Sequence, residues 1–129
     1  MKLLTVVIFF AILFQKEIDD RFIVWFEGRK LTIIDFKGIP EKGTDYSAQS
    51  FLDIKYKLTK VDTGYRVDIV STFDQNKSWI IPEYSDSLTV GHEQKHFDIC
   101  EIKSRQFRRK ISNIAVFKNK SNLLITLFD

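Results

Sequence analysis

The sequence predicts an α+β domain in which a small antiparallel sheet packs on one long helix. Three observations predict it. Residues 51–60 and 65–73 alternate apolar and polar side chains around a turn at 62–64, which is typical of a hairpin. Residues 88–112 contain no helix breaker except Gly91. That helix carries His92-Glu93-Gln94-Lys95-His96, an H-E-x-x-H pattern.

Composition indicates one packed domain. The chain has 129 residues, of which 44% are apolar and twelve are phenylalanine. The net charge of +3 and the pI near 9.0 are too weak to indicate nucleic-acid binding, so we expect no nucleic-acid partner. The single cysteine excludes an internal disulfide and a C-x-x-C zinc knuckle.

The first residues have the order of a secretory signal. Lys2 precedes an apolar run, Leu3 to Phe14, and a polar stretch follows at 15–21. A run of twelve residues is too short for a stable membrane span. We therefore predict a signal peptide or N-terminal apolar segment over residues 1–19, a secreted or periplasmic protein, and a domain over 20–129. No small-x-small cleavage triplet precedes Gln15, so a buried strand or an uncleaved anchor stays an alternative.

The remaining elements follow from alternation and turn residues. Short strands are expected at 22–26 and 30–36, joined by Glu27-Gly28-Arg29, before a loop at 38–43. After the hairpin, Trp79-Ile80-Ile81 reads as a short strand, and Ser85 to Ser87 offer N-cap side chains for the helix. The apolar runs 114–117 and 123–128 are compatible with one more hairpin.

The histidines fall on the apolar arc of the helix. Relative to His92, His96 lies at about 40° and Glu93 at about 100°. The same arc holds most apolar residues of the helix, whereas Gln94, Asp98 and Glu101 fall on the opposite side. Polar groups that face a core need a partner, which a shared metal ion would provide. The alternative is two core histidines bonded to backbone and a glutamate that reaches solvent.

Histidines four apart on a helix can hold one Zn²⁺, and the intervening glutamate can act as a general base. We therefore predict a zincin-like domain whose metal ligands are His92 and His96 and whose catalytic base is Glu93. The expected activity is hydrolysis of peptide bonds by a zinc-activated water, with a peptide or protein as substrate. The alternative is a secreted zinc-binding or degenerate domain without catalytic activity.

The sequence leaves the third zinc ligand open. Ile99 and Ile102 stand where the glycine-turn form of the motif has glycine and histidine, and no acid occurs at 115–118. Asp98 and Glu101 point away from the ligand arc on an unbroken helix. The remaining acids considered are Glu83, Asp86 and Asp129.

Three landmarks resemble a family of bacterial secreted proteins of unknown function, thought to be zinc-dependent proteases. They are Arg29-Lys30-Leu31-Thr32 leading to Asp35-Phe36-Lys37-Gly38, the pair Ser78-Trp79, and the run from His92 to Ile99, which is close to that family's H-E-Q-x-H-F-D-I signature. The resemblance implies His92 and His96 as ligands and Glu93 as base. Fuller members continue to a Tyr-Asp segment that is absent here, so we expect a truncated or divergent member.

Other candidates have simpler interpretations. Cys100 is expected as a small buried residue, Asp98 as a structural hydrogen-bond acceptor, and the basic end of the helix as a solvated face. Tyr46 and Tyr84 are candidate oxyanion donors, with ordinary packing as the alternative. Ser78 lacks a histidine outside the motif, which excludes a serine triad. A free strand edge near 79–81 is expected to hold an extended substrate.

Overall fold

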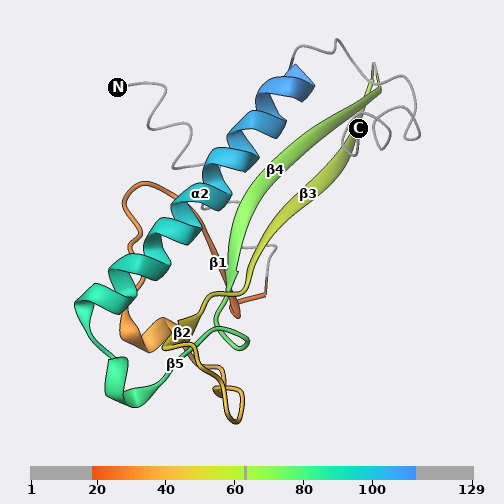
Figure 1. Cartoon of the computed structure of the whole chain (residues 1–129). Coiled ribbons are helices and arrows are strands. Elements are labelled where there is room, and N and C mark those ends of the chain that lie inside the picture. Colours follow the sequence, from red (N-terminus) through yellow and green to blue (C-terminus); the bar gives the residue numbers. More distant parts are fainter. Residues whose placement is uncertain (1–18, 63, 113–129) are drawn as a thin grey trace.

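A computed structural model describes residues 19–62 and 64–112 of the chain. In this part the fold is α+β, with a three-stranded antiparallel sheet, a two-stranded sheet and the long helix α2 (Ser87–Ser112). The helix runs along the length of the sheet (Figure 1). The expected signal segment and the expected C-terminal hairpin lie outside the described residues. No helix in the described ranges has the length and apolar character needed to cross a membrane.

The predicted central hairpin is confirmed. β3 (Leu52–Val61) pairs antiparallel with β4 (Gly64–Asp74) along its whole length. Gly64 follows the turn with φ +144°, a conformation that favours glycine. β1 (Phe22–Val24) adds to the other edge of β4 and gives the strand order β1-β4-β3.

The prediction of a strand at 30–36 is wrong. This segment instead contains a 3₁₀ helix, η1 (Ile33–Asp35). The Asp35 carboxylate accepts hydrogen bonds from the backbone N–H of Thr32 at 2.7 Å and from the Arg29 guanidinium at 2.6 Å. The backbone N–H groups of Asp35 and Phe36 also bond within the segment, to the Thr32 and Ile33 carbonyls, so they are not available to a strand partner. β1 pairs with β4 instead.

A second, two-stranded sheet lies beside the start of the helix. β2 (Ala48–Gln49) pairs antiparallel with β5 (Trp79–Ile80), which confirms the short strand expected at this tryptophan. The short 3₁₀ helix η2 (Pro82–Tyr84) then leads into α2. Asp86 caps the helix, because its Oδ1 accepts a hydrogen bond from the Thr89 N–H at 2.7 Å.

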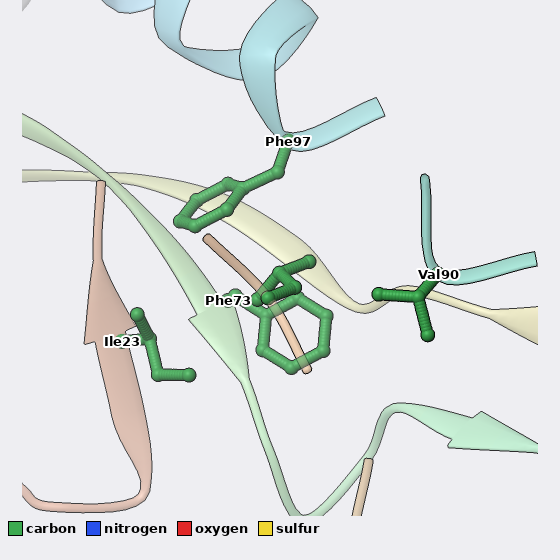
Figure 2. Packing of buried hydrophobic residues seen from close by; sticks show 5 residues of the cluster. Ile23, Phe73, Val90 and Phe97 are labelled. Atoms are coloured by element: carbon green, nitrogen blue, oxygen red, sulfur yellow. The ribbon is translucent and has the colours of Figure 1, made fainter. Parts of the chain in front are cut away.

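The apolar core lies between α2 and the sheet (Figure 2). Phe97 and Phe73 are fully buried, and their ring centroids are 5.9 Å apart. Ile23, Leu31 and Val90 complete the buried cluster. Burial of a large side chain of this kind stabilises the fold by roughly 1.5–3 kcal/mol, so the two phenylalanines hold the middle of the helix against β4.

Polar residues fill the rest of the layer between α2 and β4. Glu101 is buried and accepts a hydrogen bond from Ser71 Oγ at 2.8 Å. Arg105 Nε pairs with Glu101 at 3.0 Å, and Arg108 pairs with the same carboxylate. Arg108 also donates to the Ile69 carbonyl at 2.7 Å. Part of the basic helix end therefore binds the sheet, rather than forming only a solvated face.

Candidate metal centre

The helix presents a different side to the sheet from the one predicted. The sheet-facing residues recur at spacings of three and four, and they are Val90, Glu93, Gln94, Phe97, Glu101 and Ser104. His92 and His96 are exposed, and Leu88 is 82% exposed. The prediction that the imidazoles face the interior is therefore wrong, as is the placement of Gln94 and Glu101 in solvent. Their buried polar groups find hydrogen-bond partners instead.

The two imidazoles converge on one point. Their Nε2 atoms are 3.0 Å apart, and their ring planes meet at 82°. Two nitrogens bound tetrahedrally to one zinc ion at about 2.0–2.1 Å lie about 3.3 Å apart. The observed separation needs only a small opening to hold such an ion. Without a metal, the same distance suits a hydrogen bond between a protonated and an unprotonated ring nitrogen.

Glu93 stands at the boundary between this pair and the interior. Its side chain is only 6% exposed, and its carboxylate lies with the two imidazoles in a group whose ligand atoms are all within 4.8 Å. Oε2 accepts a hydrogen bond from Ser50 Oγ. All three predicted site residues are therefore brought together.

Two adjoining hollows open at this group. One has a volume of about 380 Å³ and reaches Glu93 and His96, and the other, of about 330 Å³, reaches Glu93 and His92. Tyr46 and Ala48 line both hollows. The candidate metal centre is thus open to solvent and to a ligand approaching between the helix and the 46–50 segment.

The strand beside the site is β2 rather than the segment 79–81. β5 pairs with β2, and the residues that line the hollows next to the histidines are Tyr46, Ala48, Gln49 and Ser50. Tyr46 is brought to the site, whereas Tyr84 lines neither hollow. Ser50 could not be recognised from the sequence, because a lone serine in a polar connection is ordinary and Ser50 lies 43 positions from its partner.

The described residues supply no further acid or thiol to the group formed by His92, Glu93 and His96. Asp86 caps the helix instead, and the hydrogen bond from Thr89 holds the pKa of its carboxyl below the ordinary value. Asp98 accepts a hydrogen bond from the Trp25 indole at 2.8 Å, as expected for a structural residue. Cys100 is half-buried, and burial raises the pKa of its thiol. A thiol in that state is a poor ligand.

Residues around the motif attach the helix to the N-terminal segment. Gln94 Oε1 accepts a hydrogen bond from the Leu31 N–H at 2.8 Å, and Gln94 Nε2 donates to Asp98 at 2.8 Å. Ser78 is fully buried and donates to the Asp74 carbonyl at 2.7 Å, while its Oγ accepts from the Phe51 N–H at 2.8 Å. These residues of the sequence landmarks therefore have structural roles.

Comparison with known proteins assigns neither a family nor a function to this chain. No protein-family model, no curated protein and no solved structure matches the chain. The family resemblance therefore stays a prediction from the motif residues.

Proposed function

We propose that this chain is a zinc-dependent metallopeptidase with a zincin-like fold. The observation that carries the proposal is the convergence of His92 Nε2 and His96 Nε2 at 3.0 Å beside the carboxylate of Glu93. Two imidazoles and a neighbouring carboxylate on one helix suit a zinc ion and a general base. The solvent-open hollows on either side give a substrate access to these groups.

Each residue has a separate part in the proposed hydrolysis. His92 and His96 would hold the metal through Nε2. A bound zinc ion lowers the pKa of water to about 7 and polarises a carbonyl group. Glu93 accepts a proton from the attacking water and returns it to the leaving amine. Tyr46, which lines both hollows, would donate a hydrogen bond to a developing oxyanion.

The arrangement of β2 suits an extended peptide. Ala48 lines both hollows, and β2 pairs with β5 along its other side. A peptide laid beside Ala48 would pass close to Glu93 and both histidines. Backbone pairing of this kind binds a substrate largely without regard to its side chains.

The incomplete ligand set favours a second candidate, a secreted zinc-binding domain without catalysis. Catalytic zinc sites usually have three protein ligands, whereas the described residues offer two imidazoles and a glutamate already bonded to Ser50. In this candidate the ion would be retained for stability alone. The two candidates differ in whether bound zinc is accompanied by peptide hydrolysis.

Two measurements test the proposal. The purified full chain is expected to bind one zinc ion. The zinc affinity of His96→Ala is expected to be at least tenfold lower, as measured by metal titration with elemental analysis. Glu93→Gln is expected to keep the zinc and to abolish hydrolysis of an unfolded protein substrate. Absence of zinc binding would contradict both candidate functions. One bound zinc ion in a wild-type chain without peptidase activity would favour the non-catalytic zinc-binding domain.

A further inference from the structure

The hydrogen bond between Ser50 and Glu93 joins the β2 segment to the proposed catalytic base. Ser50 Oγ donates to Oε2 of Glu93, and both residues line the hollow that reaches His96. We propose that Ser50 is a positioning residue that fixes the orientation of the Glu93 carboxylate. This inference rests on the proposed function and assigns a role to a residue outside the H-E-x-x-H motif.

Ser50 is itself held from both sides. Gln49 before it pairs with Trp79 in the two-stranded sheet. Phe51 after it donates its N–H to Ser78 Oγ at 2.8 Å, and its carbonyl accepts from the Asp74 N–H at 2.9 Å. The hydroxyl therefore projects from a segment whose backbone is anchored to the rest of the fold. A donor fixed in this way restricts the acceptor more than a mobile side chain does.

Among the described residues, one oxygen of the Glu93 carboxylate has a hydrogen-bond partner. In the described part of the chain Oε2 takes the Ser50 bond, and no buried side-chain oxygen or nitrogen lacks a partner. No bond to Oε1 occurs among these residues, and Glu93 lines both hollows. A carboxylate can otherwise rotate about its last torsion through a broad range. The Ser50 bond would keep Oε1 directed at the place where water has to be deprotonated.

The first test compares Ser50 with a serine that lies outside the proposed site. Ser50→Ala is expected to lower kcat by about ten- to a hundredfold with KM and zinc affinity unchanged, the range typical of residues that orient a catalytic group. Ser50→Thr keeps the hydroxyl and should recover most of kcat. Ser87→Ala is the matched control, since Ser87 is exposed and lines neither hollow. If Ser50→Ala does not fold, Ser50→Cys keeps the size and weakens the donor.

The second test needs neither metal nor activity. Urea unfolding of the metal-free chain is compared for Ser50→Ala, Glu93→Ala and the double variant. If Ser50 and Glu93 are bonded, the effects of the two single changes on the unfolding equilibrium constant should not multiply. The double variant is expected to differ from their product by about ten- to a hundredfold. Strictly additive effects of the two changes would overturn the proposed bond.

The outcomes separate this inference from the proposed function. If Glu93→Gln is inactive while Ser50→Ala keeps the kcat of the Ser87→Ala control, the positioning role is wrong and the peptidase assignment stands. If the zinc-loaded wild-type chain hydrolyses no peptide, both are overturned. A selective loss of kcat in Ser50→Ala, recovered in Ser50→Thr, supports the positioning role.

Discussion

The indole N–H of Trp25 donates a hydrogen bond to Oδ1 of Asp98 at 2.8 Å, and this bond ties the chain just after β1 to the middle of α2. The same oxygen accepts from Gln94, which in turn accepts from the backbone N–H of Leu31. The turn of α2 that contains both histidines is therefore attached to two points of the N-terminal segment. This attachment fixes the turn relative to the sheet.

Replacement of Asp98 should destabilise the fold. Asp98→Ala leaves the Trp25 and Gln94 donors without their acceptor, so we expect the free energy of unfolding to fall by about 1–3 kcal/mol. Urea denaturation followed by tryptophan fluorescence measures the change. Glu83→Ala is the control, because Glu83 is exposed and should alter stability by no more than about 0.5 kcal/mol. Equal effects of the two variants would show that the bond contributes nothing.

Gly38 is required by a close approach of two backbones. A Cβ at this position would lie 2.8 Å from the Ser78 carbonyl oxygen, to which the Gly38 N–H already donates at 2.7 Å. Gly38→Ala is expected to destabilise the protein by about 1–3 kcal/mol through overpacking. Gly91→Ala is the matched control, because nothing lies within 4 Å of its Cβ position in α2. It should stabilise the helix by about 0.5–1 kcal/mol, and a loss there of the size seen at Gly38 would contradict the steric argument.

Acid should weaken the fold through Asp35. Burial alone would raise the pKa of this carboxyl, but hydrogen bonds from Arg29 and Thr32 outweigh it and hold the pKa below the ordinary value of 3.8. The unfolded chain thus binds the proton at a higher pH than the folded chain does. The contribution of Asp35 to the free energy of unfolding is complete above about pH 3.8. It is lost as the pH falls through the pKa that Asp35 has in the folded chain.

The variant Asp35→Asn tests this acid dependence. It cannot titrate, so its free energy of unfolding should fall less steeply with pH below about 4 than that of the wild type. Urea unfolding at a series of pH values from neutral downward gives the two slopes. Identical slopes would mean that Asp35 does not contribute to acid sensitivity. Asp74, which pairs with Arg21 at 2.6 Å and also has a lowered pKa, should behave in the same direction.

Tyr46 should matter for catalysis if the proposed function holds. Its side chain is 72% exposed and lines both hollows at the candidate metal centre. Removal of the phenol in Tyr46→Phe is expected to lower kcat by about 10²–10³-fold, the usual effect of losing one oxyanion donor, with zinc content unchanged. Tyr84→Phe is the control, because Tyr84 lines neither hollow. A Tyr46→Phe enzyme as active as this control would remove the tyrosine from the mechanism.

The helix shows where prediction from the sequence reached its limit. Its extent and its cap were predictable, because residues 88–112 contain no breaker except Gly91 and Asp86 precedes them. Its orientation was not, since counting apolar residues assigned Gln94 and Glu101 to solvent. Both are buried, because Leu31 and Ser71 supply hydrogen-bond partners from segments far away in sequence.

Local sequence determined the β3–β4 hairpin, the long helix and the spacing that puts two imidazoles and a carboxylate on neighbouring positions of one helix. Those features depend on backbone periodicity and on turn residues within a few positions of each other. Only the tertiary structure decided that the histidines face solvent, that Glu93 is buried against Ser50, and that β2 borders the site. The reason is physical: hydrogen-bond partners from other segments determine which polar residues of a helix can be buried, and helical periodicity carries no information about those partners.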